Sequence, residues 1–440
     1  MRGPVARCWR VTRAPDKFPG TPASPPRTPV TSMTNNWRVV ALLCLASLVA
    51  YLVRADVAVA QERMAPALQL TMADMGVITA WGFQLTYALL QVPAGLFGER
   101  HGVRTTLALA LLGCSIASFT TGLMPDAGAS VTLVGTRILL GISQAAVFPV
   151  AAMAVSQYVA TGHRVRANAF YISSSALGAA IAPLMMAPVM EQFGWRAVFV
   201  LSGLLALTAA ATCLALLPRQ AVRAPSAPAP SLAAQLRDAQ RLMRDPNLRR
   251  LSLAYLLHSA VYFVFLFWFF RYLTEGRGFT ILASGVWASL PSIAGFVCAP
   301  IIGAAADRLG RRVGGSAARR RVAMACLLGS TALALTGAAV PSAFLAIAAL
   351  SFSSAALNGA ESPFFTTATT IGATNPGAAA GVLNLMGNLG GVLSIWLVPR
   401  MSAALGWNGT LSFWAAVAFV AALLWLTVRV EDPAPLSQPM

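Results

Sequence analysis

Charge is scarce in this sequence. Asp, Glu, Lys and Arg make up 10% of the 440 residues and hydrophobic residues 57%, whereas a soluble domain has roughly a quarter of its residues charged. The apolar residues gather in runs close to the ~20 residues that a helix needs to cross a bilayer. Because these runs do not alternate with polar residues, they predict membrane-spanning helices and exclude a soluble globular protein.

Acidic residues are scarcer still. The chain has 32 Lys and Arg against 14 Asp and Glu, which gives a formal net charge of +18. In a soluble protein this imbalance would suggest nucleic acid, but basic loops also fix the orientation of a polytopic membrane protein. We therefore expect membrane lipid as a partner and no nucleic acid.

The sequence also lacks the patterns of an enzyme or a metalloprotein. The six cysteines are too scattered for a disulfide framework or a metal site. No nucleophile–base arrangement, metal-ligand cluster or phosphate-binding loop is present in the sequence. We expect no enzyme activity, no metal and no cofactor.

Twelve membrane spans are predicted. They cover approximately residues 37–58, 76–97, 105–124, 132–155, 167–190, 197–217, 250–273, 282–306, 321–340, 343–366, 377–400 and 409–428. With the N-terminus inside, the inner segments hold 25 of the Lys and Arg residues, the outer loops hold four and the spans three. This bias places both termini in the cytoplasm, in the inner membrane of a bacterium.

The chain divides into two halves. Residues 1–36 are rich in Pro, Arg, Ser and Thr and lack the apolar stretch of a signal peptide, so they predict a disordered cytoplasmic tail. Residues 218–249 form the one long connection and predict a cytoplasmic linker between a six-helix bundle at 37–217 and another at 250–428. Residues 429–440 predict a second cytoplasmic tail, and we expect a monomer.

The two predicted bundles repeat each other. A Gly-x-x-x-acid-Arg-x-Gly-x-Arg pattern recurs 208 residues apart, first as Gly95, Glu99, Arg100, Gly102 and Arg104 and then as Gly303, Asp307, Arg308, Gly310 and Arg312. Leu177-Gly178 and Gly194-Trp195 recur 212 residues later as Leu389-Gly390 and Gly406-Trp407. Duplicated halves are a known transporter architecture with the binding site between them. The predicted fold class is an all-α membrane protein with twelve spans in two pseudo-symmetric six-helix bundles.

The repeated pattern resembles the motif between the second and third spans of the major facilitator superfamily. Its acid can pair with arginines of the neighbouring half while the glycines allow a tight turn. The motif therefore implies a latch that stabilises one arrangement of the halves. Glu99 stands where that family usually has Asp. The alternative is that the arginines only anchor the loops.

A narrower resemblance runs from residue 37 to about residue 415. Over this range, the order and spacing of several short motifs in the chain are similar to those of the anion:cation symporter family. That family comprises relatives of sialin and of bacterial sugar-acid and phthalate permeases. These include Tyr51-Leu52-Val53-Arg54-Ala55-Asp56, Arg137 to Gly141 with Phe148-Pro149, Arg166-Ala167-Asn168, Tyr272-Leu273-Thr274-Glu275, and Asn384 to Gly391. The resemblance implies transport of a small organic anion such as a sugar acid or an aromatic acid.

Two positions depart from that family. Members that couple to protons often have an acid just before the first-span arginine and a glutamate seven residues after the fourth-span arginine. This chain has Val53 and Gln144 at those positions, although it keeps both arginines. The departures argue against ordinary proton coupling and leave a facilitator, an exchanger or a sodium-linked carrier as alternatives.

Two of the three arginines inside predicted spans lie away from the span ends, where an ionisable group costs about 2.5–3.5 kcal/mol and normally faces a cavity or a partner. Arg54 and Arg137 can point at a central cavity, and a guanidinium suits bidentate capture of a carboxylate. For each, a structural ion pair is the alternative, with Asp56 as the candidate partner of Arg54. Residues two apart on a helix point in different directions, which favours substrate contact for Arg54.

The remaining embedded charges each have two interpretations. Arg271, near a span end, can reach the cavity mouth or the outer headgroups, and His258 can titrate near neutral pH or serve packing. Glu361 can neutralise a cavity arginine or carry a coupling proton. Asp56 lies near the outer end and the sequence shows no partner for His258, so we predict that any proton coupling runs through Glu361.

Uncharged polar residues complete the candidate site. Asn384 and Asn388 are four residues apart and share a helix face. They can hydrogen-bond a hydroxylated substrate, or they can belong to helix packing beside the neighbouring glycines. Further candidates for the cavity lining are Tyr51, Tyr87, Gln91, Gln144 and Trp268.

Together these features predict a secondary transporter that imports a small organic anion by alternating access. A proton or a sodium ion is the expected co-transported partner. An exporter of the same superfamily is one alternative, although a multidrug exporter would need an apolar cavity with acids rather than inward arginines. A transporter-like ligand sensor is the alternative from another class.

Overall fold

The computed structural model describes residues 37–125, 129–159, 163–219, 237, 240–372 and 376–429. The predicted N-terminal tail 1–36 lies outside the described residues. So do the predicted C-terminal tail from residue 430 onward and most of the predicted linker.

Helices account for nearly all the described residues. The first half contains α1 (Trp37–Ala67), α2 (Met72–Val77), the π-helix η1 (Ile78–Leu85), α3 (Thr86–Leu123), α4 (Ala129–Gln144), α5 (Val147–Tyr158), α6 (Arg164–Phe193) and α7 (Trp195–Leu216). The second half contains α9 (Pro246–Arg271), the π-helix η3 (Tyr272–Gly276), α10 (Ile281–Trp287), α11 (Leu290–Val313), α12 (Gly315–Ala339), α13 (Ala343–Ile371) and α14 (Pro376–Thr427).

Ten described segments are long and apolar enough to cross a membrane. One of them belongs to α14, whose 52 residues would extend ~78 Å at ~1.5 Å per residue, more than twice the thickness of the hydrocarbon layer. The backbone leaves the helical region at Gly406 and folds α14 into two crossings. Another crossing, formed by α2, η1 and the start of α3, precedes the segment Phe97–Leu123. These two additions bring the described crossings to the twelve that the sequence predicted.

The seventh crossing shows how local sequence sets a helix start. Asp245 accepts hydrogen bonds from the backbone N–H groups of Asn247 (2.7 Å) and Leu248 (3.2 Å), and Pro246 occupies the first turn. Both residues are typical of helix starts. The aspartate accepts hydrogen bonds from backbone N–H groups that have no helical carbonyl partner, and the proline has no N–H group to satisfy. The helix therefore begins at residue 246, four residues earlier than the apolar run alone predicted.

Four glycines make the tightest turns between consecutive crossings. Gly102, Gly194, Gly314 and Gly406 have φ between 67° and 86°, a region that disfavours any side chain because the Cβ approaches the backbone. Gly314 follows Gly102 by 212 residues, and Gly406 follows Gly194 by the same interval. The turns therefore recur in the two halves at one constant spacing.

One expectation about the repeated motif is wrong. The pattern aligned Gly310 with Gly102 as a turn residue, but α11 continues through Gly310 to Val313 and the chain turns at Gly314. The four extra residues amount to one additional helical turn. The second-half motif thus ends in the last turn of α11, and the chain turns after the motif rather than within it.

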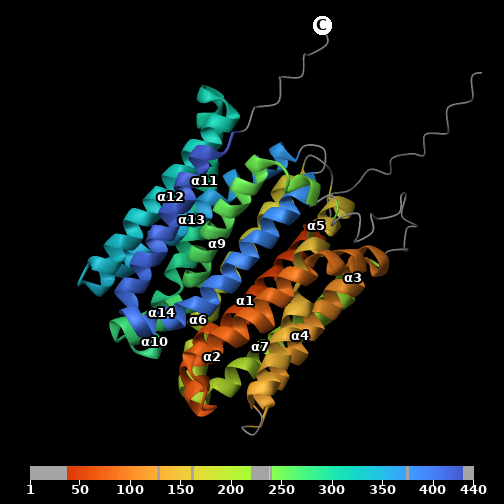
Figure 1. The fold of residues 1–440 in the computed structure, drawn as a ribbon. Helices are drawn as coiled ribbons and strands as arrows, with labels where there is room; N and C mark the ends of the chain where they lie inside the picture. The colour runs from red at the N-terminus through yellow and green to blue at the C-terminus, as the bar shows by residue number, and fades with distance from the viewer. Residues whose placement is uncertain are drawn as a thin grey trace, which may run out of the picture.

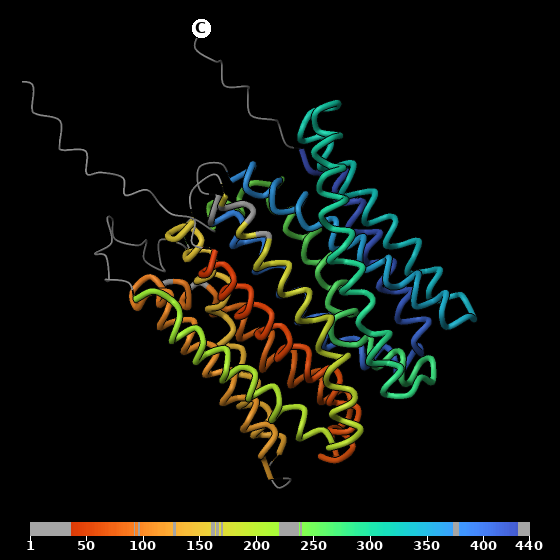
Figure 2. Tube along the Cα trace, turned by 180° about the vertical axis from the view of Figure 1, so that it is seen from behind, coloured from red at the N-terminus to blue at the C-terminus, as the bar shows by residue number. Residues whose placement is uncertain are grey.

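The helices form two groups that lie side by side (Figures 1 and 2). The first half, red to yellow-green, packs mainly on itself, and so does the second half, green to blue. Helix α1 begins and α14 ends at the same end of the molecule (Figure 1). We call this the terminal end, and the opposite end, where Gly194 and Gly406 turn, the distal end.

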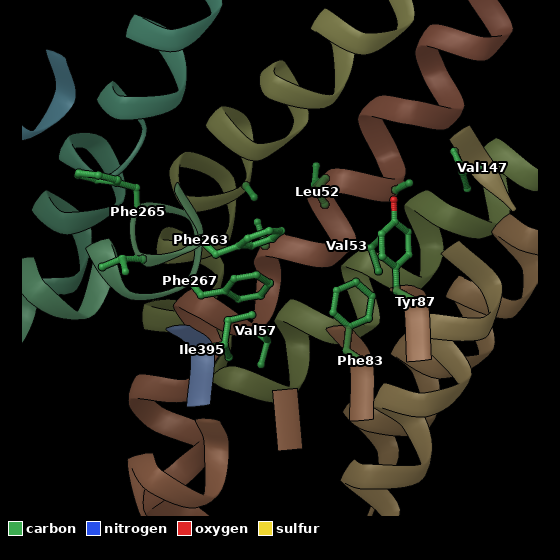
Figure 3. Packing of buried hydrophobic residues seen from close by; sticks show 14 of the residues in the cluster. Leu52, Val53, Val57, Phe83, Tyr87, Val147, Phe263, Phe265, Phe267 and Ile395 are labelled. Atoms are coloured by element: carbon green, nitrogen blue, oxygen red, sulfur yellow. The ribbon is translucent and has the colours of Figure 1, made fainter. Parts of the chain in front are cut away.

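The two halves are in close contact toward the distal end. A Cβ added to Gly76 would lie 2.9 Å from the carbonyl oxygen of Ile395, so α2 and α14 approach at backbone distance. Figure 3 shows an apolar layer in which Phe263 and Phe267, stacked 6.0 Å apart on α9, lie beside Val57 and Ile395. This packing closes the distal side of the interface.

The left-handed turns give a direct test of the fold. Gly194→Ala should destabilise the protein by about 1–2 kcal/mol because φ at this position is +82° while no atom lies within 4 Å of the added methyl. Gly135→Ala, in α4 with equally open surroundings and helical φ, is the matched control and should be neutral or stabilising. Thermal unfolding in detergent measures both, and equal melting temperatures would contradict the assignment of strain to φ.

Candidate substrate site

Arg54, on α1, is surrounded by aromatic rings. Its guanidinium carbon is 4.3 Å from the ring centre of Tyr87, 4.5 Å from that of Tyr51 and 5.0 Å from that of Phe83. Its Nε donates to Oε1 of Gln144 at 3.0 Å. Such rings attract a cation through their faces. The predicted residues Arg54, Tyr51, Tyr87 and Gln144 therefore come together at one place.

Gln144 explains how the arginine is held without a counter-charge. Its Nε2 donates to the carbonyl oxygen of Ala50 at 2.8 Å, which fixes the amide so that its oxygen faces Arg54. Within the part of the chain that the structure describes, no carboxylate pairs with Arg54, whose residue exposure is only 3%. Glutamine thus orients the guanidinium and leaves its positive charge for another group to neutralise.

Arg137 has a different environment, inside the first half. Its Nη1 lies 3.9 Å from Oδ1 of Asp56, and its Nη2 donates to the hydroxyl of Thr121 at 3.2 Å. Both charged side chains are almost fully buried. Asp56 therefore pairs with Arg137 and not with Arg54, and the geometry supports the ion-pair alternative for Arg137 over substrate contact.

Glu361 lies on α13 of the second half, between two residues of α9. Tyr255 donates its hydroxyl proton to Oε1 of Glu361 at 2.6 Å, and Nδ1 of His258 lies 3.8 Å from Oε2. The sequence had offered no partner for His258, so this pairing corrects that reading. The other ring nitrogen, Nε2, lies 3.0 Å from the carbonyl oxygen of Leu357 and must carry a proton there, since a carbonyl only accepts.

Glu361 and His258 place an acidic and a basic side chain next to each other. With Nε2 protonated, Nδ1 is bare in the neutral imidazole and protonated in the imidazolium. The bare Nδ1 and the carboxylate therefore offer two acceptors within 3.8 Å of each other. The Glu361 side chain is 47% exposed although it lies far from either end of its helix, whereas the His258 side chain is only 2% exposed.

Arg54 and Glu361 belong to opposite halves of the molecule, on α1 and α13. Arg54 contacts Tyr51, Tyr87 and Gln144 of the first half, and Glu361 contacts Tyr255 and His258 of the second half. Each of the two charges is therefore held by side chains of its own half.

Amide side chains form hydrogen bonds between the two halves. Nε2 of Gln84 donates to Oδ1 of Asn388 at 2.7 Å, and Nδ2 of Asn384 donates to Oε1 of Gln91. Nδ2 of Asn388 also donates to the carbonyl oxygen of Asn384 at 2.8 Å. Three of these four residues were predicted. Gln84, seven residues before Gln91, was missed, and that two-turn helical spacing is the signal that could have found it.

An ion-pair network closes the distal mouth. Nη1 of Arg271 lies 3.2 Å from Glu62 of the first half, while its Nε lies 2.9 Å from Glu275. Thr274 donates to Glu62, and Trp407 donates to Glu275. Arg271 therefore joins the two halves in this arrangement. Glu62 was not among the predicted site residues.

Trp268 and the predicted latch residues take no part in these contacts. Trp268 is 2% exposed, and its indole N–H has no hydrogen-bond partner among the described residues, which fits a packing role. Glu99 and Asp307 are exposed, and no described side chain forms an ion pair with either. Arg104 donates from Nε to the carbonyl oxygen of Leu214 at 2.6 Å. The latch stays a prediction for another arrangement of the halves.

Comparison with known proteins identifies the family. The sequence profile of the Major Facilitator Superfamily matches residues 43–394, most of the chain. The chain belongs to the major facilitator superfamily. Solved structures agree: an inward-facing, occupied bacterial homologue of the human lysosomal transporter Spinster has a TM-score of 0.71 at 16% identity, covering 90% of this chain and 97% of that one. A D-xylose-proton symporter reaches 0.70 at 15% identity, with 89% and 97% covered. At these identities both show the fold alone.

Curated relatives of this superfamily member include sugar-acid transporters of the anion:cation symporter type. The D-galactonate transporter of Escherichia coli O6:H1 is 26% identical over 412 residues, covering 88% of this chain and 93% of that protein. The probable galactarate/D-glucarate transporter GarP of Escherichia coli K12 is 24% identical over 423 residues, covering 89% and 94%. Both the superfamily and the narrower resemblance read from the motifs are confirmed.

The buried Asp56–Arg137 pair gives a stability test. Arg137→Leu should cost about 3–5 kcal/mol because it leaves the Asp56 carboxylate buried without a counter-charge. The double variant Asp56→Leu, Arg137→Leu should recover most of that loss, since it removes both charges together. Chemical unfolding in detergent measures the difference, and a double variant less stable than the single one would show that the pair is not the source of the effect.

Proposed function

We propose that this protein transports a small organic anion across the bacterial inner membrane by alternating access, with Arg54 capturing the carboxylate. One observation carries the proposal: the buried Arg54 guanidinium has its geometry fixed by Gln144 and its charge unneutralised by any described residue. Burying an uncompensated charge is costly. An anionic ligand relieves that cost, so the empty site favours anions.

Sugar acids are the substrate class that the surroundings support. The carboxylate meets Arg54, and Asn384 with Gln91, one on each half, offers amide donors and acceptors. Hydroxyl groups suit these partners, because each hydroxyl both donates and accepts. The relatives named for galactonate and for galactarate or glucarate transport support the same class.

The charge distribution of the loops supports an orientation with both termini in the cytoplasm. The terminal end then faces inward and the distal end outward. The distal closure by Glu62, Arg271 and the Phe263–Phe267 layer corresponds to an inward-facing arrangement. Import follows when the distal contacts open to admit the anion and re-form behind it. Export and uncoupled exchange use the same two arrangements and are separated by measured flux.

Coupling is proposed to run through Glu361 together with His258. Val53 and Gln144 replace the usual acids, so no carboxylate lies beside Arg54 to exchange a proton as the anion binds. Glu361 is accessible to solvent and shares its surroundings with a histidine that can hold a proton. A ligand sensor without transport is distinguished from this reading by uptake into proteoliposomes.

Arg54→Ala should weaken binding of the substrate anion more than tenfold, since a charge-assisted hydrogen-bonded pair contributes roughly 1.5–3 kcal/mol. Arg54→Lys should restore little, because an ammonium cannot form the two-pronged contact. The measurement is isothermal titration of purified protein with a panel of sugar acids and aromatic acids.

The matched control is Arg63→Ala, which removes an exposed arginine paired with Glu191 in the same half. It should bind like the wild type. Unchanged affinity in Arg54→Ala would refute capture by Arg54, and failure of every carboxylate to bind the wild type would refute the proposed substrate class.

The distal network predicts a conformational shift. Glu62→Gln should raise the population open at the distal end, because Arg271 loses its partner on the first half. Spin labels at Val131 and Leu282, exposed residues on the two halves at that end, should report longer distances. Glu191→Gln, whose carboxylate pairs within the first half, is the control. An unchanged distance distribution in Glu62→Gln would exclude a gating role.

A further inference from the structure

A basic cavity lies at the terminal end of the second half, apart from the proposed substrate site. Its volume is about 230 Å³, and it lies where α12 begins and where α13 and α14 end. The residues that line it include Arg320, Thr367, Trp425 and Arg429. A single water needs only ~10–15 Å³ of such space. The cavity is therefore large enough for a polyatomic ligand.

Two arginines of this cavity have no counter-charge. Arg320 lies in the second turn of α12, and Arg429 follows the end of α14. Both residues are exposed, and no carboxylate forms an ion pair with either guanidinium in the part of the chain that the structure describes. The planar fork of a guanidinium matches the oxygens of a phosphate group. The pair therefore suits an anion with several oxygens.

The buried wall of the cavity holds two more unpaired polar groups. Thr367 is 2% exposed and Trp425 is 1% exposed. Among the described residues, neither the Thr367 hydroxyl nor the Trp425 indole N–H has a hydrogen-bond partner. An edge-to-face contact with Phe364, with the ring centres 5.0 Å apart, holds the indole in place. Buried polar groups are normally hydrogen-bonded, so two unpaired ones in a single cavity wall indicate a bound water or ligand.

The two arginines also mark the edge of the apolar surface. On α14 the exposed Leu426 precedes Arg429 by three residues, and on α12 the exposed Leu328 follows Arg320 by eight. The first separation is less than one helical turn in length, and the second is about two turns. Arginines at the end of a lipid-facing surface lie at the depth of the headgroups. The cavity is therefore within reach of a lipid headgroup.

We propose that this cavity binds the phosphate group of an anionic phospholipid in the adjacent leaflet. The phosphate oxygens accept hydrogen bonds from Arg320 and Arg429, and Thr367 and Trp425 supply donors on the buried side. Basic pockets between membrane helices recurrently bind such headgroups. An anionic headgroup is favoured over a zwitterionic one, because the cation of a choline headgroup would meet two arginines without counter-charges.

Native mass spectrometry of the purified full-length protein measures this binding. The protein, freed of lipid in detergent, is titrated with dioleoylphosphatidylglycerol and separately with dioleoylphosphatidylcholine, which has the same phosphodiester but adds a cation. The first phosphatidylglycerol should bind to the wild type at least about tenfold more tightly than the first phosphatidylcholine. Inorganic phosphate, added to the phosphatidylglycerol complex, tests whether the phosphate group alone occupies the cavity.

Variants assign the binding to the cavity. The double variant Arg320→Gln, Arg429→Gln should bind phosphatidylglycerol more than about tenfold more weakly, because two charge-assisted contacts are lost. Thr367→Val keeps the shape and both arginines and should weaken binding about fivefold, which gives a second test should the double variant fail to fold. Arg321→Gln is the matched control, since it removes the same charge from the next residue of α12, outside the cavity lining. It should bind like the wild type.

Equal weakening in Arg321→Gln and in the double variant would overturn the inference, because a general attraction between basic residues and anionic lipid would then explain the binding. Equal binding of the two lipids by the wild type would also overturn it. Displacement of phosphatidylglycerol by inorganic phosphate would support the phosphate contact, whereas binding of inorganic phosphate without any binding of phosphatidylglycerol would overturn the lipid source. These outcomes are independent of anion capture by Arg54.

Discussion

The molecule depends on one constraint, a buried arginine that is fixed in place but not neutralised by the protein. Arg54 is surrounded by aromatic faces and by the amide of Gln144, groups that orient a cation without cancelling its charge. A carboxylate at the position of Gln144 would have satisfied the guanidinium within the protein. In the proposed function, the glutamine leaves the pairing to a mobile anion, and the cost of burying the arginine becomes affinity for that ligand.

The closure of the distal side is built from contacts that can be broken. The halves meet there through single hydrogen bonds, one shared arginine and an apolar layer, whereas the Asp56–Arg137 pair holds the first half together internally. Buried pairs within a bundle make it a rigid unit, while exposed or partly exposed pairs between bundles contribute little each. This division of strong internal and weak mutual contacts favours rigid-body rearrangement of the halves over internal repacking.

The sequence predicted the membrane crossings and the charged residues within them because both are local properties of the chain. Arg54 stood out as a charge within an apolar run, and the membrane makes such a residue costly wherever it lies. The pairing of Arg137 with Asp56 could not be read, since 81 residues separate them and only the packed helices bring them together. Glu62 was overlooked because an acid near a span end is ordinarily a solvated loop residue. Gly310 misled because its pattern repeats a turn that the structure places one helical turn later.

The buried charge of Arg54 ties the proposed transport to the membrane voltage. A guanidinium at Arg54 and a carboxylate at Glu361 together carry no net charge. A bound monoanion makes the sum negative, and moving that charge inward against a negative-inside potential costs ~2.3 kcal/mol per 100 mV. In the proposed coupling, a proton on Glu361 removes that cost, because the loaded carrier then moves no net charge. A polarised cell can thus accumulate the anion through an acid that takes up a proton on the half opposite the arginine.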